Sequence, residues 1–475
     1  MAEARVRHLP HESVLYRVVR EHLSGLLREA GEHGGFPPFI EQTFRAYLDC
    51  GIPERGCIRL HCDHCGHDSV VAFSCKRRGV CPSCSARGMG DGAANLVDHV
   101  LPHAPYRQWV VSYPFELNGI LAFQPEVCSA VEGLVMRMVA KLMKRKAGGA
   151  QAGGILVRHR FGSSVNLHIH VHLLVVDGTY DVVDGELRFR PAPELTTADL
   201  AGFATELHTR LWRLLQRRGA LPTRADDDGG NLQLPLGALG SCAQAAMRHG
   251  VRARQGPALA VVDEEDVERP RTGLTANVSG MSVYASSVVG AEQREVLEKL
   301  CRYLLRGPLT LGRLAQRPDG MLTYRLKKPD KRGNTVLVLN PKELMMRLCS
   351  LIPAPRHHVR RAFGILASGA KNRKLVVPSP TVGRRKACEE HSEAERESPP
   401  TRRPVQHAVP WAELLKRVWG VDALKCGRCG QQMRAMALIK DPVQAARLCG
   451  GTGDATVHPR ATGPPDDGWE ASAVA

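Results

Sequence analysis

The strongest constraint on the fold lies at residues 166–178, NLHIHVHLLVVDG, where three histidines alternate with apolar residues. Successive side chains of a β-strand point to opposite faces, so His168, His170 and His172 should share one face. Burying an imidazole without a partner is costly, so this row needs something to face. A divalent cation is the best candidate, and a site that mixes imidazole and oxygen ligands suits Mg²⁺ or Mn²⁺. The alternative is a strand whose polar face simply carries histidines.

Neighbouring periodicities place this strand in a sheet. The run GGILVRHRFG at 153–162 is also β-patterned and lies only a few residues away, which predicts an antiparallel pair. RQWVVSYPF at 107–115 predicts another strand. Helical spacing of apolar residues predicts helices at 125–147, 197–218 and 291–306. The chain should therefore have an α+β fold, with a central antiparallel sheet flanked by helices.

Two CxxC pairs predict a zinc-binding module near the amino terminus, and these pairs are Cys62 with Cys65 and Cys81 with Cys84. Their separation matches the C-x2-C-x15–20-C-x2-C pattern of structural zinc, so we expect one tetrahedral ion bound by all four thiolates. The alternative is a chance grouping of buried thiols. Candidates nearby for an exchanged ligand or a second ion are Cys57, His61, His64, His67 and Cys75. A later pair, Cys426 and Cys429, is half of a site.

The overall charge indicates a polyanionic partner. The chain has 475 residues, a formal net charge of +17 and a sequence pI near 9.4, which favour nucleic acid. Lys76, Arg77 and Arg78, between the CxxC pairs, would contact phosphates or form an ordinary solvated loop. The sequence has no apolar run of membrane-spanning length and no signal segment, and its 15 cysteines fit metal ligands better than disulfides. We therefore expect a cytoplasmic, nucleoid-associated protein that does not enter a membrane.

The order of motifs along the chain resembles a known family. SCKRRGVCPSC lies in the zinc module, RFGSSVNLHIHVHLLVVDGTY surrounds the histidines, and LCRYLLRGPLTLGRL precedes DGMLTYRLKKP. This order, from about residue 40 to 375, resembles the rolling-circle transposases of the insertion sequence 91 family, which are HUH nucleases. The resemblance implies that His170 and His172 form the metal pair, with either Asn166 or His168 as the third protein contact. His168 falls where the family tolerates other residues.

The same resemblance implies that Tyr303, on the helix at 291–306, is the nucleophile. Some family members carry two tyrosines spaced Tyr-x-x-x-Tyr on this helix, but position 299 is lysine here, so the chain should be a single-tyrosine variant. Tyr284 and Tyr324 are alternative nucleophiles in strand-like segments. The residues that bracket the tyrosine, and would hold phosphates or stay solvated, are Arg302 and Arg306.

Composition and the resemblance together imply a domain order. The expected parts are a helical and zinc-binding domain at 1–100, an HUH-type nuclease domain at 101–375, a flexible linker at 376–408, a small carboxy-terminal module at 409–450 and a disordered tail at 451–475. The length of 475 residues and the 43% apolar fraction are sufficient for two or three domains with substantial cores.

The implied function is the cutting and rejoining of single-stranded or hairpin DNA at the ends of a mobile element, which drives rolling-circle transposition. Tyr303 would form a covalent 5′-phosphotyrosine intermediate, with Mg²⁺ or Mn²⁺ as the catalytic cation and Zn²⁺ in a structural role. One alternative is a zinc-dependent DNA-binding regulator or decayed transposase without catalysis. Others are a metal-dependent hydrolase with a water nucleophile, and a replication initiator or relaxase that shares the nuclease chemistry.

Overall fold

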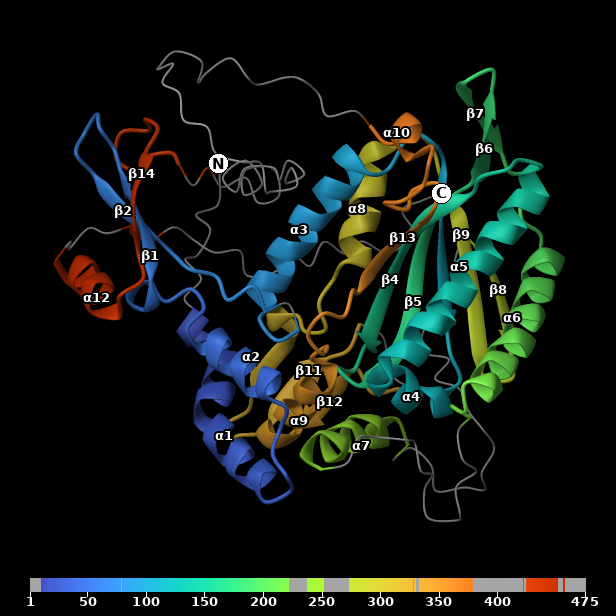
Figure 1. The fold of residues 1–475 in the computed structure, drawn as a ribbon. Coiled ribbons are helices and arrows are strands. Elements are labelled where there is room, and N and C mark those ends of the chain that lie inside the picture. The colour runs from blue at the N-terminus through green and yellow to red at the C-terminus, as the bar shows by residue number, and fades with distance from the viewer. Residues whose placement is uncertain are drawn as a thin grey trace, which may run out of the picture.

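The structure combines helices with antiparallel sheets, as the sequence predicts (Figure 1). It is a computed structural model, and it describes residues 10–77, 79–221, 237–251, 273–327, 329, 333–378, 422, 424–451 and 456–457. A six-stranded sheet with helices on both faces forms the centre, and a four-stranded sheet lies to one side, at the left of Figure 1. The candidate chemistry lies on one face of the larger sheet.

The six-stranded sheet has the order β13-β4-β5-β3-β9-β8, and every neighbouring pair is antiparallel. Its strands are β3 (Tyr106–Ser112), β4 (Gly153–Phe161), β5 (Leu167–Val176), β8 (Gly273–Val278), β9 (Met281–Val289) and β13 (Arg360–Gly364). The predicted antiparallel pair corresponds to β4 and β5 and is confirmed. Its register places His159 directly opposite His170.

Helices cover both faces of this sheet, and the four that matter for the site are α3 (Pro82–His99), α5 (Pro125–Ala147), α6 (Thr197–Arg217) and α8 (Arg294–Leu304). On one face, α5 and α6 pack in a common core with Trp109 and Leu173. On the opposite face, α3 and α8 pack with Leu174 and Val176. Because side chains of β5 alternate between two buried faces, the strand is almost continuously apolar after its histidines.

Local chemistry fixes where the flanking helices begin and end. Thr196 and Asp199 form a reciprocal capping box at the start of α6. Gly148 adopts a left-handed conformation, with φ of 70°, and ends α5 at the predicted boundary. A buried ion pair between Arg158 of β4 and Glu132 of α5 joins that helix to the sheet. The strand that carries His159 is therefore held firmly from its other face.

The four-stranded sheet joins segments from the two ends of the chain, in the order β14-β1-β2-β15. Its strands are β1 (Cys57–His61), β2 (Asp68–Ala72), β14 (Arg434–Ile439) and β15 (Thr456–Val457). Figure 1 shows β14 and α12 (Pro442–Gly451) in red beside the blue β1 and β2 hairpin. Part of the expected carboxy-terminal module therefore shares a sheet with the amino-terminal module. The expected linker lies outside the described residues from position 379 onward.

The remaining elements lie outside these two sheets. They are η1 (Pro10–Glu12), α1 (Val14–Gly31), α2 (Pro38–Leu48), η2 (Pro53–Arg55), η3 (Phe115–Leu117), α4 (Asn118–Phe123), β6 (Gly178–Val183), β7 (Glu186–Pro191), α7 (Ala238–Val251), η5 (Leu311–Arg313), β10 (Leu314–Gln316), β11 (Leu322–Arg325), β12 (Val336–Leu339), α9 (Pro341–Leu351) and α10 (Arg373–Val376). Within the described ranges no single helix has the length and apolar content to cross a membrane. The pair Phe115–Phe123 and Pro125–Ala147, bent by 116°, meets that test only in combination.

Candidate active site and metal centres

Three histidines converge on the face of the sheet that α3 and α8 cover. His159 of β4 and both His170 and His172 of β5 are buried, and one ligand nitrogen from each lies within 4.8 Å of the other two. The ring centroid of His159 is 4.3 Å from that of His172 and 5.1 Å from that of His170. A set of three imidazoles with the remaining positions open to oxygen ligands suits a divalent cation that faces phosphate.

The third member of this cluster is neither Asn166 nor His168, the two residues that the resemblance left open as the third protein contact of the metal. His168 shares the face but is only half-buried, and its ring centroid lies 5.0 Å from that of His170. The Oδ1 atom of Asn166 accepts a hydrogen bond from Ser164 Oγ at 2.8 Å. Neither residue belongs to the group of three, in which His159 joins the expected pair. His159 is therefore the member of this histidine cluster that sequence analysis missed.

A register shift explains why His159 escaped prediction. Phe161 pairs with Leu167, and an unbroken antiparallel register from this pair would place His159 opposite Ile169, on the apolar side of β5. The register shifts by one residue between His159 and Phe161, so His159 pairs with His170 and shares its face. Nothing in the run RHRF marks this shift, so strand periodicity alone could not identify the third imidazole.

Hydrogen bonds define which nitrogen of each ring would bind a metal. The Nε2 atom of His159 donates to the carbonyl oxygen of Leu304 at 2.7 Å, so Nδ1 carries the lone pair. The Nδ1 atom of His170 lies 3.4 Å from a carbonyl oxygen of its own strand, and its buried Nε2 atom has no hydrogen-bond partner among the described residues. The Gln108 side-chain amide contacts Nδ1 of His172 at 3.0 Å, so His172 would bind through Nε2. Such outer contacts orient metal-binding imidazoles.

The ionisation state of the cluster also fits metal binding. Burial, followed by the neighbouring rings of His168 and His159, holds the pKa of His170 well below the usual value for an imidazole. The guanidinium of Arg306 acts in the same direction. His170 is therefore neutral near pH 7, and neutral imidazole is the form that binds metals.

Tyr303 lies beside the histidine cluster near the carboxyl end of α8. Its ring centroid is 5.8 Å from that of His172, and the two rings are nearly perpendicular, at 88°. The tyrosine is half-buried at the edge of an apolar stripe, whose buried members are Leu297, Leu300 and Leu304. Because His159 donates to the carbonyl group of the residue that follows Tyr303, the cluster and this end of the helix are directly joined.

The two arginines that bracket Tyr303 have different surroundings. The guanidinium carbon of Arg306 lies 4.3 Å from the centroid of the Tyr303 ring, in a cation–π contact. Arg302 instead forms an ion pair with Glu298 of the same helix, at 2.6 Å. Of the two arginines, Arg306 is therefore the one in direct contact with the tyrosine ring.

The other predicted residues lie away from this centre or outside the described chain. The alternative nucleophiles are deeply buried, since Tyr284 of β9 is 7% exposed and Tyr324 of β11 is 2% exposed. In the basic loop, Lys76 and Arg77 are exposed, whereas Arg78 lies outside the described residues. Of the three candidate tyrosines, Tyr303 is the one whose ring contacts the histidine cluster.

The helix that carries Tyr303 is fixed against α3. The guanidinium of Arg294, at the start of α8, donates to the carbonyl oxygens of Val97, Leu101 and Pro102 near the end of α3. Toward the other end, a Cβ atom added to Gly92 would lie 2.6 Å from a methyl carbon of Leu305. The Leu305 side chain, which follows α8, therefore packs directly against the backbone of α3 at this glycine.

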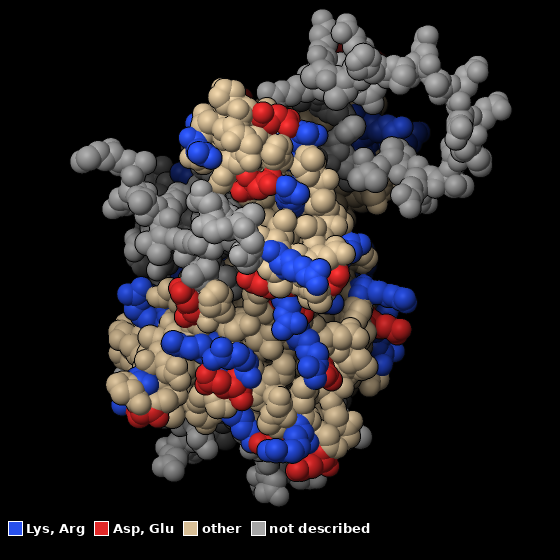
Figure 2. Space-filling model, turned by 90° about the vertical axis from the view of Figure 1, so that its left-hand side faces the viewer, with Lys and Arg blue, Asp and Glu red and all other residues tan. Residues whose placement is uncertain are grey.

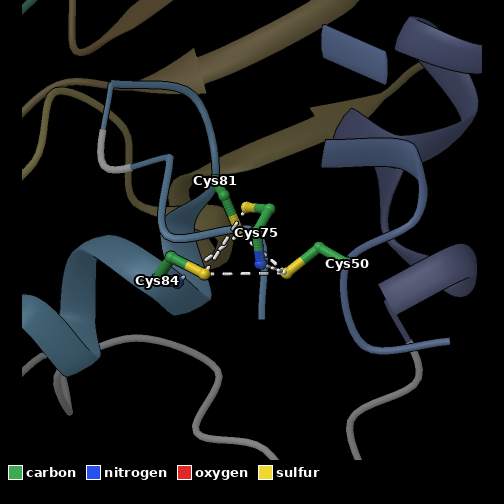
Figure 3. A group of neighbouring side chains, drawn as sticks. All are labelled: Cys50, Cys75, Cys81 and Cys84. Atoms are coloured by element: carbon green, nitrogen blue, oxygen red, sulfur yellow. Dashed lines mark hydrogen bonds between the residues drawn. The ribbon is translucent and has the colours of Figure 1, made fainter. Parts of the chain in front are cut away.

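A four-cysteine cluster lies at the start of α3 (Figure 3), and its members are Cys50, Cys75, Cys81 and Cys84. The Sγ atom of Cys50 is 3.6 Å from the Sγ atoms of both Cys81 and Cys84, and the sulfurs of Cys75 and Cys84 are 3.5 Å apart. Backbone N–H groups donate to these sulfurs, including that of Arg77 to Cys75 at 3.4 Å. Four sulfurs at such distances fit tetrahedral zinc.

The predicted grouping of both CxxC pairs in one zinc site is wrong. Cys62 and Cys65 lie at the tip of the β1–β2 hairpin with Cys426 and Cys429, whereas Cys81 and Cys84 lie with two single cysteines. The five residues of β2 carry the chain roughly 16 Å back from the hairpin tip before the second pair begins. The spacing rule counts residues along the chain and cannot register that intervening strand.

The basic charge is distributed rather than concentrated on the face shown in Figure 2. Lys and Arg side chains are spread over this face beside Asp and Glu, and they do not merge into a continuous basic band. This is the side of the molecule at the left of Figure 1. The formal net charge of +17 is therefore not concentrated on this particular face.

Comparisons with known proteins find matches for both the region that carries the histidine cluster and the amino-terminal region that carries the first cysteines. Residues 153–374 match the family described as "Putative transposase", and residues 18–113 match "Transposase zinc-binding domain". The chain is 25% identical over 413 residues, 86% of each chain, to "Transposase for insertion sequence element IS801" of Pseudomonas savastanoi pv. phaseolicola. It is 24% identical over 399 residues, 82% of this chain and 86% of the relative, to "Putative transposase y4qJ" of Sinorhizobium fredii. No solved structure matches the chain.

Proposed function

The chain belongs to the insertion sequence 91 family of transposases, and we propose that it cuts and rejoins single-stranded DNA with Tyr303 as the nucleophile. The substrate is a single strand or an extruded hairpin at the ends of a mobile element, and the reaction drives rolling-circle transposition. One observation carries the proposal: the helix that bears Tyr303 is joined to a buried three-histidine cluster. The rings of Tyr303 and His172 are 5.8 Å apart, and His159 donates to the Leu304 carbonyl group.

The proposed step transfers a phosphoryl linkage from the DNA to the tyrosine. The phenol oxygen of Tyr303 attacks the scissile phosphorus, and the bond from phosphorus to the 3′ oxygen breaks. The phenol loses its proton as the new bond forms, and the leaving 3′ oxygen takes up a proton to become a hydroxyl group. The product is a 5′-phosphotyrosine. Attack by a 3′-hydroxyl group reverses the step, so rejoining needs no nucleotide cofactor.

The residues around the tyrosine have separate roles in this step. When bound by His159, His170 and His172, a Mg²⁺ or Mn²⁺ ion supplies Lewis-acid polarisation of the phosphate. The Leu304 carbonyl group and the Gln108 amide hold two of these rings in their binding orientations. Arg306, which is not part of the histidine cluster, offers guanidinium donors to the phosphate oxygens beside the tyrosine.

Denaturing gel electrophoresis of labelled single-stranded DNA from the element's ends, with and without Mn²⁺, tests the nucleophile. Wild-type protein and the Tyr284→Phe control should give a protease-sensitive covalent adduct, and Tyr303→Phe should give none. Cleavage by Tyr303→Phe without an adduct would indicate a water nucleophile. Binding of DNA by the wild-type protein with neither cleavage nor adduct would indicate a DNA-binding protein without catalysis.

The same assay tests the third imidazole. His159→Ala should reduce the rate of adduct formation more than about 100-fold, because even outer contacts of metal ligands are worth about 10–100-fold. His170→Ala and His172→Ala should lose at least as much. His168→Ala is the matched control, since it removes a neighbouring imidazole from the same face, and it should retain most of the rate. A large loss in His168→Ala with none in His159→Ala would return the third contact to His168.

A further inference from the structure

A second four-cysteine cluster joins the two ends of the chain. Its sulfurs pair across 367 and 361 positions of sequence, with 3.4 Å between Cys62 and Cys429 and 3.6 Å between Cys65 and Cys426. All four ligand atoms lie within 4.8 Å of one another. The matched zinc-binding region, residues 18–113, contains only the first two of these cysteines. The cluster is complete only when the carboxy-terminal segment is present.

The two halves of the cluster are built in the same way, as Cys-x-x-Cys-Gly turns. Gly66 and Gly430 follow the second cysteine of each pair in left-handed conformations, with φ of 66° and 75°. Each glycine N–H donates to the carbonyl oxygen of the first cysteine, at 2.9 Å in both turns. The first cysteine donates in turn to a carbonyl oxygen five residues later, that of His67 in one turn and Gln431 in the other. The two equivalent turns direct four thiols at one point. A chance grouping of cysteines would not need this repeated geometry.

The surrounding segment is packed as one unit with the amino-terminal hairpin. β14 pairs antiparallel with β1 from Cys57 opposite Ile439 to His61 opposite Arg434. A small separate core lies beneath the cluster and is formed by Leu60, Cys62, Cys426 and Met433. Ser69 of β2 donates to the Met433 sulfur at 3.7 Å. The carboxy-terminal segment is therefore part of this module and completes its sheet.

The spacing of the sulfurs fits a metal ion better than disulfides. Zinc bound to four thiolates at about 2.3 Å places its sulfurs about 3.8 Å apart, whereas a disulfide needs about 2.05 Å. The observed 3.4 Å and 3.6 Å lie close to the zinc spacing. We propose that Cys62, Cys65, Cys426 and Cys429 bind a second structural zinc ion, which closes the two ends of the chain into one module.

Metal counting on the full chain tests this site without any use of DNA or of Tyr303. Native mass spectrometry of the wild-type protein should show one zinc ion for each cysteine cluster, besides any ion that the three histidines hold. Cys426→Ser/Cys429→Ser should bind one zinc ion fewer than the wild-type protein, and Cys57→Ala, which removes a buried thiol of the same module outside both clusters, should bind as many as the wild-type protein. A wild-type protein with one zinc ion would overturn the proposal, as would a double variant that binds as many zinc ions as the wild-type protein.

Cobalt substitution gives a second readout, whose first comparison uses the wild-type chain alone. A chain loaded with Co²⁺ at both clusters should show thiolate-to-cobalt absorption at about twice the intensity of a single Co(Cys)₄ site. The intensity should fall by about half in Cys426→Ser/Cys429→Ser and stay unchanged in Cys57→Ala. Wild-type intensity equal to that of one tetrathiolate site would reject the second centre.

A cleavable chain tests whether the metal holds the ends together. With a protease-recognition sequence placed within residues 379–421, the fragment that contains Cys426 and Cys429 should stay bound to the rest of the chain after cleavage. A zinc chelator should release it, and the same cleavage in Cys426→Ser/Cys429→Ser should release it without chelator. Release from the zinc-loaded wild-type chain, or retention after complete zinc removal, would contradict the proposed role.

Discussion

The two cysteine clusters offer the same ligands to a metal but lie in very different surroundings. The first contributes to the main hydrophobic core, through its buried members Cys50, Cys81 and Cys84. The second lies in a small core of its own, formed by Leu60, Cys62, Cys426 and Met433. The difference shows that equal ligand sets need not carry equal shares of stability, because a site stabilises what it is packed against.

The largest effect should follow from opening the first cluster. Cys81→Ser/Cys84→Ser removes half of its ligands at the start of α3, the helix that packs against α8. Structural zinc contributes about 10–16 kcal/mol in small zinc domains, whereas whole domains are stable by about 5–15 kcal/mol. We expect a loss above about 5 kcal/mol in the free energy of unfolding, seen as loss of the main thermal transition by circular dichroism.

The matching double variant of the second cluster should have a much smaller effect on the main unfolding transition. Cys426→Ser/Cys429→Ser should leave the main transition within about 0.5 kcal/mol, because distant sites contribute independently. It should remove only the part of the signal that belongs to the small module. If both double variants lowered the main transition equally, the two clusters would not differ in the way their surroundings indicate.

A smaller but still large effect should follow from breaking the ion pair beneath the histidine cluster. The side chains of Arg158 and Glu132 are only 4% and 1% exposed, and Arg361 also lies 3.4 Å from the Glu132 carboxylate. Glu132→Gln leaves a buried guanidinium without its counter-charge, which costs about 3–5 kcal/mol. Urea unfolding measures this change. The double replacement Arg158→Met/Glu132→Leu should recover most of it, and failure to recover would assign the loss to packing rather than charge.

The sequence predicted the parts of this core that depend on local periodicity. The helix at 125–147 has the expected bounds, and the β4–β5 pair forms as expected, because short connections favour pairing of adjacent strands. His170 and His172 share a face because side chains two residues apart on a strand point the same way. His159 depended on a one-residue register shift, which reverses the face of a side chain without changing the sequence pattern.

The cysteine sites were harder to predict because a metal site depends on distances in space. Two pairs with a familiar spacing indicated one site, but β2 separates them, and each pair finds its partners elsewhere. Cys50 has no metal-binding motif around it, Cys75 was only a candidate for an exchanged ligand, and Cys426 lies beyond a long stretch of chain. Only the tertiary structure brings such partners together, so the sequence predicted zinc ligands without their correct grouping.

An intermediate effect should follow from loosening α8 on α3. Arg294→Ala removes three charged hydrogen bonds to carbonyl oxygens of Val97, Leu101 and Pro102. Hydrogen bonds to charged groups are worth about 1.5–3 kcal/mol, so we expect a loss of about 2 kcal/mol in the free energy of unfolding. Arg302→Ala is the control on the same helix, because its partner Glu298 lies within the helix and such pairs contribute about 0.2–0.5 kcal/mol. Equal losses in the two variants would mean that the contact with α3 adds nothing beyond an ordinary helical ion pair.

The smallest effect should come from the ion pair between Arg434 of β14 and Asp63 at the hairpin tip. Its atoms are 2.7 Å apart, but the two side chains are 60% and 62% exposed. Exposed pairs are worth about 0–1 kcal/mol and weaken with salt, so Arg434→Ala should change the unfolding of the small module by less than about 1 kcal/mol. A double-mutant cycle with Asp63→Ala at low and high salt measures the coupling. A small coupling would mean that the thiolates, the strand pairing and the small core hold the chain ends together. A coupling above about 2 kcal/mol would mean that surface charge contributes more to the stability of the small module than its exposure indicates.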